Sequence, residues 1–227
     1  MKIKKHISYK LLSTLMLLSI FSSMIFTACG NSKDEYKTVV EAQKEKQAAL
    51  DKRANEALDS GSFDERIEVL TEYTALDDFT NELAFKLSAE LRKDAEAEFE
   101  KGNLEKAYEL AKKIFTGMAL PENVGLLAKI AKPYSKASFD KKDYLKAKEA
   151  AAKVLELYWD EEAMGMKLAA EFELLKLAIQ ENDLVQGQKY YDDIMEVTGL
   201  KGNENLAKKY RDNTKKYSDK FPESKFK

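Results

Sequence analysis

The chain has 227 residues, with 38 Lys and Arg against 40 Asp and Glu, one histidine and one cysteine. General nucleic-acid binding requires a concentrated patch of basic residues, whereas this chain has a net charge of −2. We therefore expect no nucleic-acid partner. A single cysteine excludes an internal disulfide bond. Three prolines and nine glycines, beside abundant Ala, Glu, Lys and Leu, predict an all-α protein.

Residues 1–28 have the pattern of a secretory signal peptide. Four lysines within the first ten residues precede the apolar run LLSTLMLLSIFSSMIF (residues 11–26), and small residues follow it. The run is shorter than the roughly 20 apolar residues of a membrane-spanning helix. We therefore interpret it as an export signal and exclude it from the folded body.

Thr27 and Ala28, directly before Cys29, resemble the lipobox of bacterial lipoproteins, although Phe26 stands where that family usually has leucine. The resemblance implies that Cys29 receives a thioether-linked diacylglycerol and, after cleavage, further acyl chains such as palmitate. Residues 29–35 would then be the lipidated cysteine and a polar tether. The protein is expected to be anchored to a bacterial membrane, on its periplasmic or extracellular face. The alternative is ordinary secretion with a free thiol.

Charge is distributed unevenly along the remaining chain. Residues 61–100 contain twelve acidic and four basic residues, whereas residues 201–227 contain nine basic and four acidic residues. Solvated helix faces explain this distribution. The alternative is a basic tail that meets an anionic surface or an acidic partner.

Residues 36–200 repeat one helix–turn–helix pattern about every 40 residues. After the polar turns SGS, KGN, KKD and END, apolar or small residues recur at helical spacing. We expect the second helix of each unit to start at the same register position, at Phe63, Leu104, Tyr144 and Leu184. The pattern predicts four units.

The segments KGNLEKAYELAKKI and KKDYLKAKEAAAKV resemble the second half of a tetratricopeptide repeat (TPR). Ala107, Ala147 and Gly187 match that family's small packing position, where paired helices touch closely. The family period is about 34 residues, so these helices are longer or their linkers looser. The resemblance implies a right-handed helix-turn-helix repeat solenoid. A compact bundle without a groove is the alternative.

The last segment, residues 201–227, predicts a basic C-terminal capping helix and tail, as a solenoid needs at its open end. Its heptad KFPESKF is similar to an inter-repeat linker of TPR lipoproteins that assemble outer-membrane proteins. Pro133 is expected to kink or split the first helix of unit three, and Pro121 fits a first-turn position.

No motif for catalysis, a cofactor or a metal is found. His6 lies in the signal peptide and Cys29 is consumed by lipid, so the remaining chain lacks the usual nucleophiles, bases and soft-metal ligands. The adjacent pairs Asp77–Asp78 and Asp192–Asp193 point in different directions on a helix or turn. We predict a protein that is not an enzyme and has no cofactor.

In TPR proteins the first helix of each unit lines a concave binding groove. Carried over by alignment, the groove positions are Ala89, Arg92 and Glu96 in unit two, Lys129, Lys132 and Lys136 in unit three, and Ala169, Phe172 and Lys176 in unit four. The lysines could form a basic strip for an acidic segment. The alternative is a solvated helix face. Four tyrosines are expected to pack between helices: Tyr144, Tyr158, Tyr190 and Tyr191. Trp159 either closes the core or lies at an edge.

Together these features predict a membrane-anchored, non-enzymatic adapter or scaffold lipoprotein that binds another protein of the cell envelope. Two alternatives remain open. The protein could be an accessory factor for outer-membrane protein assembly or solute transport, or it could bind host molecules at the cell surface.

Overall fold

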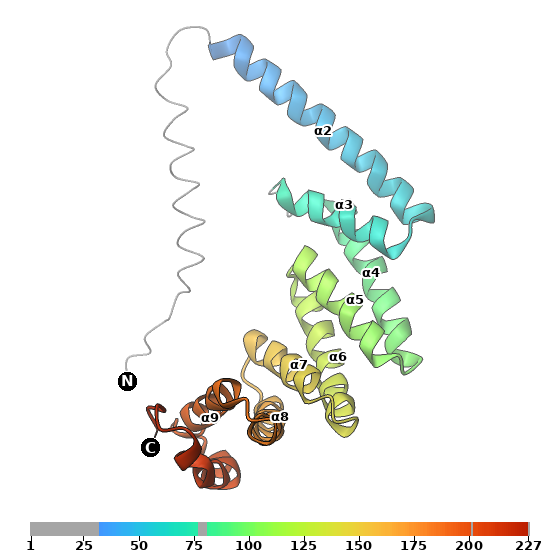
Figure 1. Ribbon diagram of the computed structural model, residues 1–227. Helices are drawn as coiled ribbons and strands as arrows, with labels where there is room; N and C mark the ends of the chain where they lie inside the picture. Colours follow the sequence, from blue (N-terminus) through green and yellow to red (C-terminus); the bar gives the residue numbers. More distant parts are fainter. Residues whose placement is uncertain (1–31, 77–80, 201, 227) are drawn as a thin grey trace. The chain divides into compact units, whose positions relative to one another are not determined.

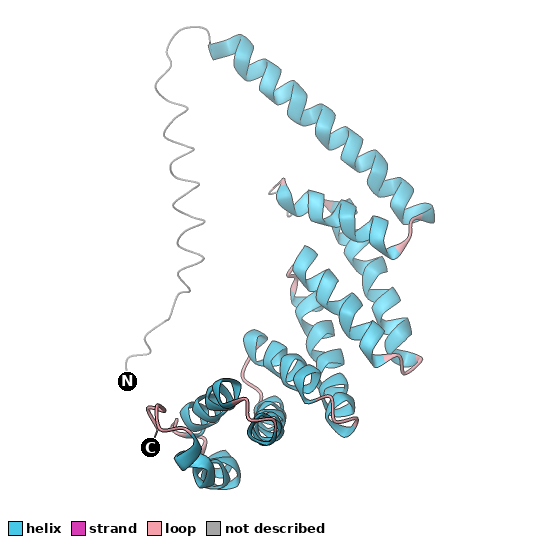
Figure 2. Ribbon diagram, viewed as in Figure 1, coloured by secondary structure: helices cyan, strands magenta, loops and turns pink. Residues whose placement is uncertain are grey.

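The computed structural model describes residues 32–76, 81–200 and 202–226 (Figure 1). The chain divides into two units, residues 1–52 and 53–227. Helix α2 (Ser32–Ser60) begins in the first unit and ends in the second. Among the described residues all regular structure is helical, and loops and turns occur between helices and after the last one (Figure 2). The predicted all-α class is confirmed.

From α3 to α9 the second unit is a succession of helices in which shorter ones of 13–15 residues alternate with longer ones of 19–20 residues. From α3 to α9 each helix packs against the next, and α3, α4 and α6 also contact α5, α6 and α8, respectively (Figure 1). The helices are α3 (Phe63–Ala75), α4 (Glu82–Glu100), α5 (Leu104–Gly117), α6 (Pro121–Asp140), α7 (Tyr144–Leu157), α8 (Glu161–Gln180) and α9 (Leu184–Thr198).

The predicted repeat register agrees with the observed helix boundaries. Helices α3, α5, α7 and α9 begin at the four expected residues, Phe63, Leu104, Tyr144 and Leu184. Ala107 and Ala147 are fully buried, and Gly187 is buried too. A Cβ atom at Gly187 would lie only 3.1 Å from the Phe221 ring, which shows how closely the chain approaches there.

Three turns between paired helices share one backbone geometry. Gly102, Lys142 and Asn182 each adopt a positive φ, of 78°, 64° and 58°. The next residue's amide donates to a carbonyl five residues earlier, as from Asp143 to Ser138 at 2.9 Å. This is the Schellman arrangement that satisfies the last carbonyls of a helix. The three turns recur at intervals of 40 residues.

Both proline expectations can be compared with α6. Pro121 is its first residue, as predicted, where the missing amide hydrogen costs nothing. Pro133 lies inside the helix without splitting it, since α6 runs unbroken from Pro121 to Asp140.

Residues 204–220 are helical, as expected for a cap, but in four short pieces. They are α10 (Glu204–Leu206), the π-helical η1 (Ala207–Arg211), α11 (Asp212–Thr214) and the 3₁₀-helical η2 (Lys215–Lys220). Tyr210 and Phe221 are buried in the core that α8 and α9 form with this segment. The Tyr210 hydroxyl also donates to the Gly165 carbonyl at 3.3 Å.

Because the turn residue adopts a positive φ, removing a side chain there should stabilise the protein and adding one should destabilise it. Lys142→Gly should raise the free energy of unfolding by about 0.5–1 kcal/mol, because relief of left-handed strain exceeds the added entropy of the unfolded chain. Gly102→Ala should lower it by a similar amount, since a Cβ at Gly102 meets no atom within 4 Å and only the backbone is strained. Urea unfolding of both variants measures this, and a destabilised Lys142→Gly would contradict it.

Candidate functional site

The junction at which α4, α5 and α6 meet is filled by a buried polar cluster. The Asn123 side-chain amide donates to Ser88 Oγ at 2.9 Å and to the Met118 carbonyl at 2.7 Å. Arg92 donates to Asn123 Oδ1 at 2.9 Å and to Ser88 Oγ at 3.1 Å. Asn123 is only 1 % exposed. Its side chain therefore occupies the space between α4 and α6.

Forty residues later, where α6, α7 and α8 meet, this cluster is replaced by smaller or different side chains. Alanines at 128 and 163 stand at the positions of Ser88 and Asn123, and Lys132 stands at that of Arg92. A cavity of about 230 Å³ opens at this place. We call it the α6–α8 slot.

The α6–α8 slot has apolar walls and a charged rim. Pro133, Ala151, Ala163 and Met166 supply apolar surface from three helices. Charged groups stand at its edge, and the complete lining is Lys132, Pro133, Ser135, Lys136, Ala151, Glu162, Ala163 and Met166. Such a shape suits one large apolar side chain with polar groups beside it.

The rim charges differ in how they are engaged. Lys132 donates to Asp160, the N-cap residue of α8, and this hydrogen bond holds the pKa of Asp160 below its usual range. Lys136 and Glu162 are exposed, and within the described residues neither forms an ion pair. Lys136 is therefore the cation of the rim that is available to a binding partner.

The other predicted groove residues lie mostly in contacts within the chain. Lys129 Nζ lies 3.4 Å from Glu96, and Lys176 Nζ lies 2.7 Å from Glu173. Arg92 belongs to the Asn123 cluster. Phe172 packs against the core of α8 and α9. Of the predicted strip, the structure brings only Lys132 and Lys136 to the slot.

Cys29, His6 and the pair Asp77–Asp78 lie outside the described residues. Within the described ranges, none of the helices has the length and apolar character needed to cross a membrane. The expected inter-helix packing is found for Tyr190 and Tyr191, which are buried, and Tyr144 is half-buried. The expectation is wrong for Tyr158, which is 43 % exposed because it lies in the loop after α7, and Trp159 beside it lies at an edge rather than in the core.

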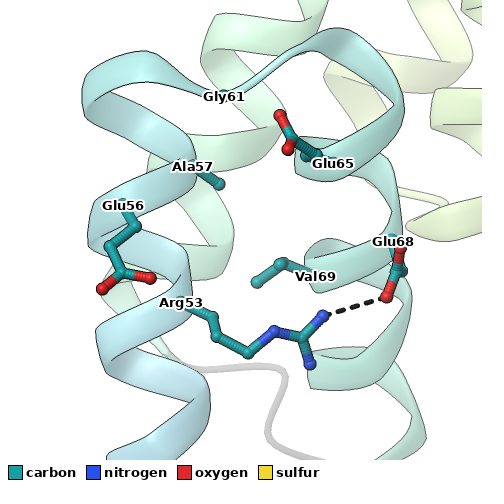
Figure 3. Close-up of a pocket in the computed structure, with 7 residues that line it drawn as sticks. All are labelled: Arg53, Glu56, Ala57, Gly61, Glu65, Glu68 and Val69. Carbon is teal, nitrogen blue, oxygen red and sulfur yellow. Dashed lines mark hydrogen bonds and ion pairs between the residues drawn. The ribbon is translucent and has the colours of Figure 1, made fainter.

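A second hollow, of about 370 Å³, lies between the end of α2 and helix α3. Figure 3 shows Arg53 extending from α2 toward Glu68 of α3, with Glu56 and Glu65 on either side. Arg53 contacts Glu68 at 3.0 Å and Glu72 at 2.7 Å. Its charge is thereby matched within the chain, so this hollow is weaker as a binding site than the α6–α8 slot.

One buried carboxylate lies apart from both hollows. Glu171 of α8 is 1 % exposed and accepts a hydrogen bond from Lys167 at 2.6 Å. Burial raises its pKa, opposed by the charge of Lys167. Because Glu171 lines neither hollow, it belongs to the packing of α8 rather than to a site.

Sequence reasoning found Lys132 and Lys136 but missed the apolar walls. Alignment of the units at their period of 40 residues could have indicated the cavity, since the small Ala163 stands at the position equivalent to Asn123. It was not decisive alone, because a small residue opens a cavity only if no neighbour fills the space. Comparison with protein-family models, with curated proteins and with solved structures gives no match for this chain.

The polar cluster predicts a large cost for Asn123→Ala. The variant would remove the Asn123 hydrogen bonds to the Met118 carbonyl, the Arg92 guanidinium and Ser88 Oγ and open a cavity, which should lower the free energy of unfolding by roughly 2–3 kcal/mol. Ala119→Asn, an exposed change in the neighbouring loop, is the control and should stay within about 0.5 kcal/mol of the parent. Chemical denaturation of both variants tests this, and equal stabilities would contradict the role of Asn123.

Proposed function

We propose that the chain is an exported, lipid-anchored adapter that binds another envelope protein without catalysing a reaction. Its repeated hairpins would form a TPR-like, right-handed solenoid that carries the binding site. The observation that supports this most directly is the α6–α8 slot, an apolar cavity rimmed by Lys136 in one junction of an otherwise regular repeat.

The slot fits a side chain of a partner protein better than a reacting substrate. Its apolar walls are the side chains of Pro133, two alanines and Met166. The one hydroxyl of its lining, Ser135 Oγ, donates to the Ala147 carbonyl at 2.7 Å, and the charged groups stand at the rim, so the lining holds no nucleophile paired with a base. One apolar side chain in the slot, beside an acidic group near Lys136, would anchor the partner. The remaining contacts would come from the neighbouring first helices.

The membrane anchor is proposed from Cys29 and the signal before it. Two or more acyl chains are sufficient for stable anchoring, whereas a single chain gives only reversible binding. An anchored adapter would need no membrane-spanning helix. Residues 30–35, the last four of which already belong to α2, would separate the acyl chains from the rest of the chain.

Filling the slot is expected to abolish partner capture. The full chain, purified in nonionic detergent, is immobilised and exposed to a detergent extract of the cell envelope. Ala163→Asn installs the residue that fills the equivalent junction, and should reduce the captured partner at least about tenfold. Lys136→Glu should weaken capture through repulsion of the partner's acidic group.

Two control variants accompany this experiment. Ala119→Asn and Lys208→Glu make the same chemical changes at exposed positions outside the slot and should retain capture. Equal capture by Ala163→Asn and Ala119→Asn would remove the slot from the proposal.

Lipid attachment is tested separately at Cys29. Cells fed labelled palmitate should label the parent chain, and the chain should remain with the membrane fraction after washing with salt. Cys29→Ala should lose both the label and the membrane association, because no other cysteine is present. Membrane association that survives in Cys29→Ala would argue against the lipid anchor.

A further inference from the structure

The loop between α7 and α8 differs from its counterpart between α5 and α6. In the α5–α6 loop, Met118 is 3 % exposed and is followed by the small Ala119. Forty residues later the same positions are Tyr158, 43 % exposed, and Trp159, 61 % exposed. The α7–α8 loop thus carries aromatic surface that the fold of a single chain leaves in solvent.

This aromatic loop adjoins the α6–α8 slot. Asp160, which directly follows Trp159, pairs with Lys132, and Ala163 lines the slot. In the single chain Trp159 keeps most of its surface exposed, so it does not fill the slot of its own chain. An exposed tryptophan beside an apolar cavity is typical of an interface anchor.

The residues around Trp159 have the chemistry that the slot selects. The loop offers one large apolar side chain followed by three acids in the order WDEE (residues 159–162). The slot offers apolar walls and the exposed cation Lys136 on α6. One surface therefore carries an apolar side chain beside a cavity that could accept it, and acidic groups beside a cation that could pair with them.

A surface that carries both a projection and its matching cavity is self-complementary, which is the requirement for an isologous contact between two identical chains. We propose that two copies of this chain pair about a two-fold axis, with Trp159 of each copy inserted into the α6–α8 slot of the other. Glu161 and Glu162 of each copy then face Lys136 of its partner, whereas Asp160 stays paired with Lys132 of its own chain.

This inference rests on the proposed function, because both use the α6–α8 slot as a binding site. A copy that is paired with itself has its slot occupied, so an envelope partner must compete with the second copy. Self-pairing thereby sets the concentration above which the adapter is closed to its partner.

The test uses two variants that complement each other. Trp159→Ala keeps the slot but lacks the inserting side chain, and Ala163→Asn keeps the side chain but fills the slot. The full chain and both variants are purified in nonionic detergent, and pairing is measured by co-capture of differently tagged copies. Each variant alone should pair at least about tenfold more weakly than the parent.

An equimolar mixture of the two variants should pair more tightly than either alone, because it restores one of the two Trp159–slot contacts. Trp159 is the only tryptophan, so in this mixture it is present only in the Ala163→Asn copy. Its fluorescence emission should shift to shorter wavelength when Trp159→Ala is added, and should not shift with Trp159→Ala that also carries Ala163→Asn.

Failure of this inference is distinguishable from failure of the proposed function. Absence of pairing in the parent, or a mixture that pairs no better than its components, overturns self-pairing even if Ala163→Asn abolishes partner capture. Emission that is already at short wavelength at every dilution also overturns it, since Trp159 would then fill its own slot. Conversely, successful complementation with partner capture unchanged in Ala163→Asn upholds self-pairing and removes the slot from partner binding.

Discussion

The repeated turn is the constraint on which the architecture of residues 82–198 depends. One residue in the left-handed region, at 102, 142 or 182, reverses the chain and satisfies the last carbonyls of the preceding helix. It also fixes where the next helix starts, at Leu104, Tyr144 or Leu184. The small residues at 107, 147 and 187 then lie where the paired helices touch, because each stands three residues after that start.

Because the helix boundaries repeat, the contrast between the two junctions lies chiefly in their side chains. Asn123 joins α4 to α6 through a buried cluster, whereas Ala163 leaves a cavity between α6 and α8. A buried amide with its partners satisfied stabilises a junction, and a cavity destabilises it unless something occupies the space. Under the proposed function, the α6–α8 junction would be the place where packing stability is given up for a binding cavity.

The sequence predicted the all-α class and the register of the units because both follow from local periodicity. It did not predict which lysines form ion pairs within the chain, because their acidic partners lie about 30 residues away in the sequence. Lys129 pairs with Glu96 and Lys132 with Asp160, across successive units. It also missed the broken helical geometry of residues 204–220, since π- and 3₁₀-helical turns arise from how Tyr210 and Phe221 pack against α8 and α9.

Two of the lysines on α6 form ion pairs with the neighbouring units, which leaves fewer lysines for binding a partner. The exposed pair Lys129–Glu96 contributes at most about 1 kcal/mol, so it does little for stability. The two ion pairs do, however, match the charges of Lys129 and Lys132 within the chain, which removes these lysines as free cations for a partner. Lys136 remains, next to the apolar α6–α8 slot. Recognition would then be local to one junction, with the other units serving to hold α6 and α8 at the spacing that keeps the slot open.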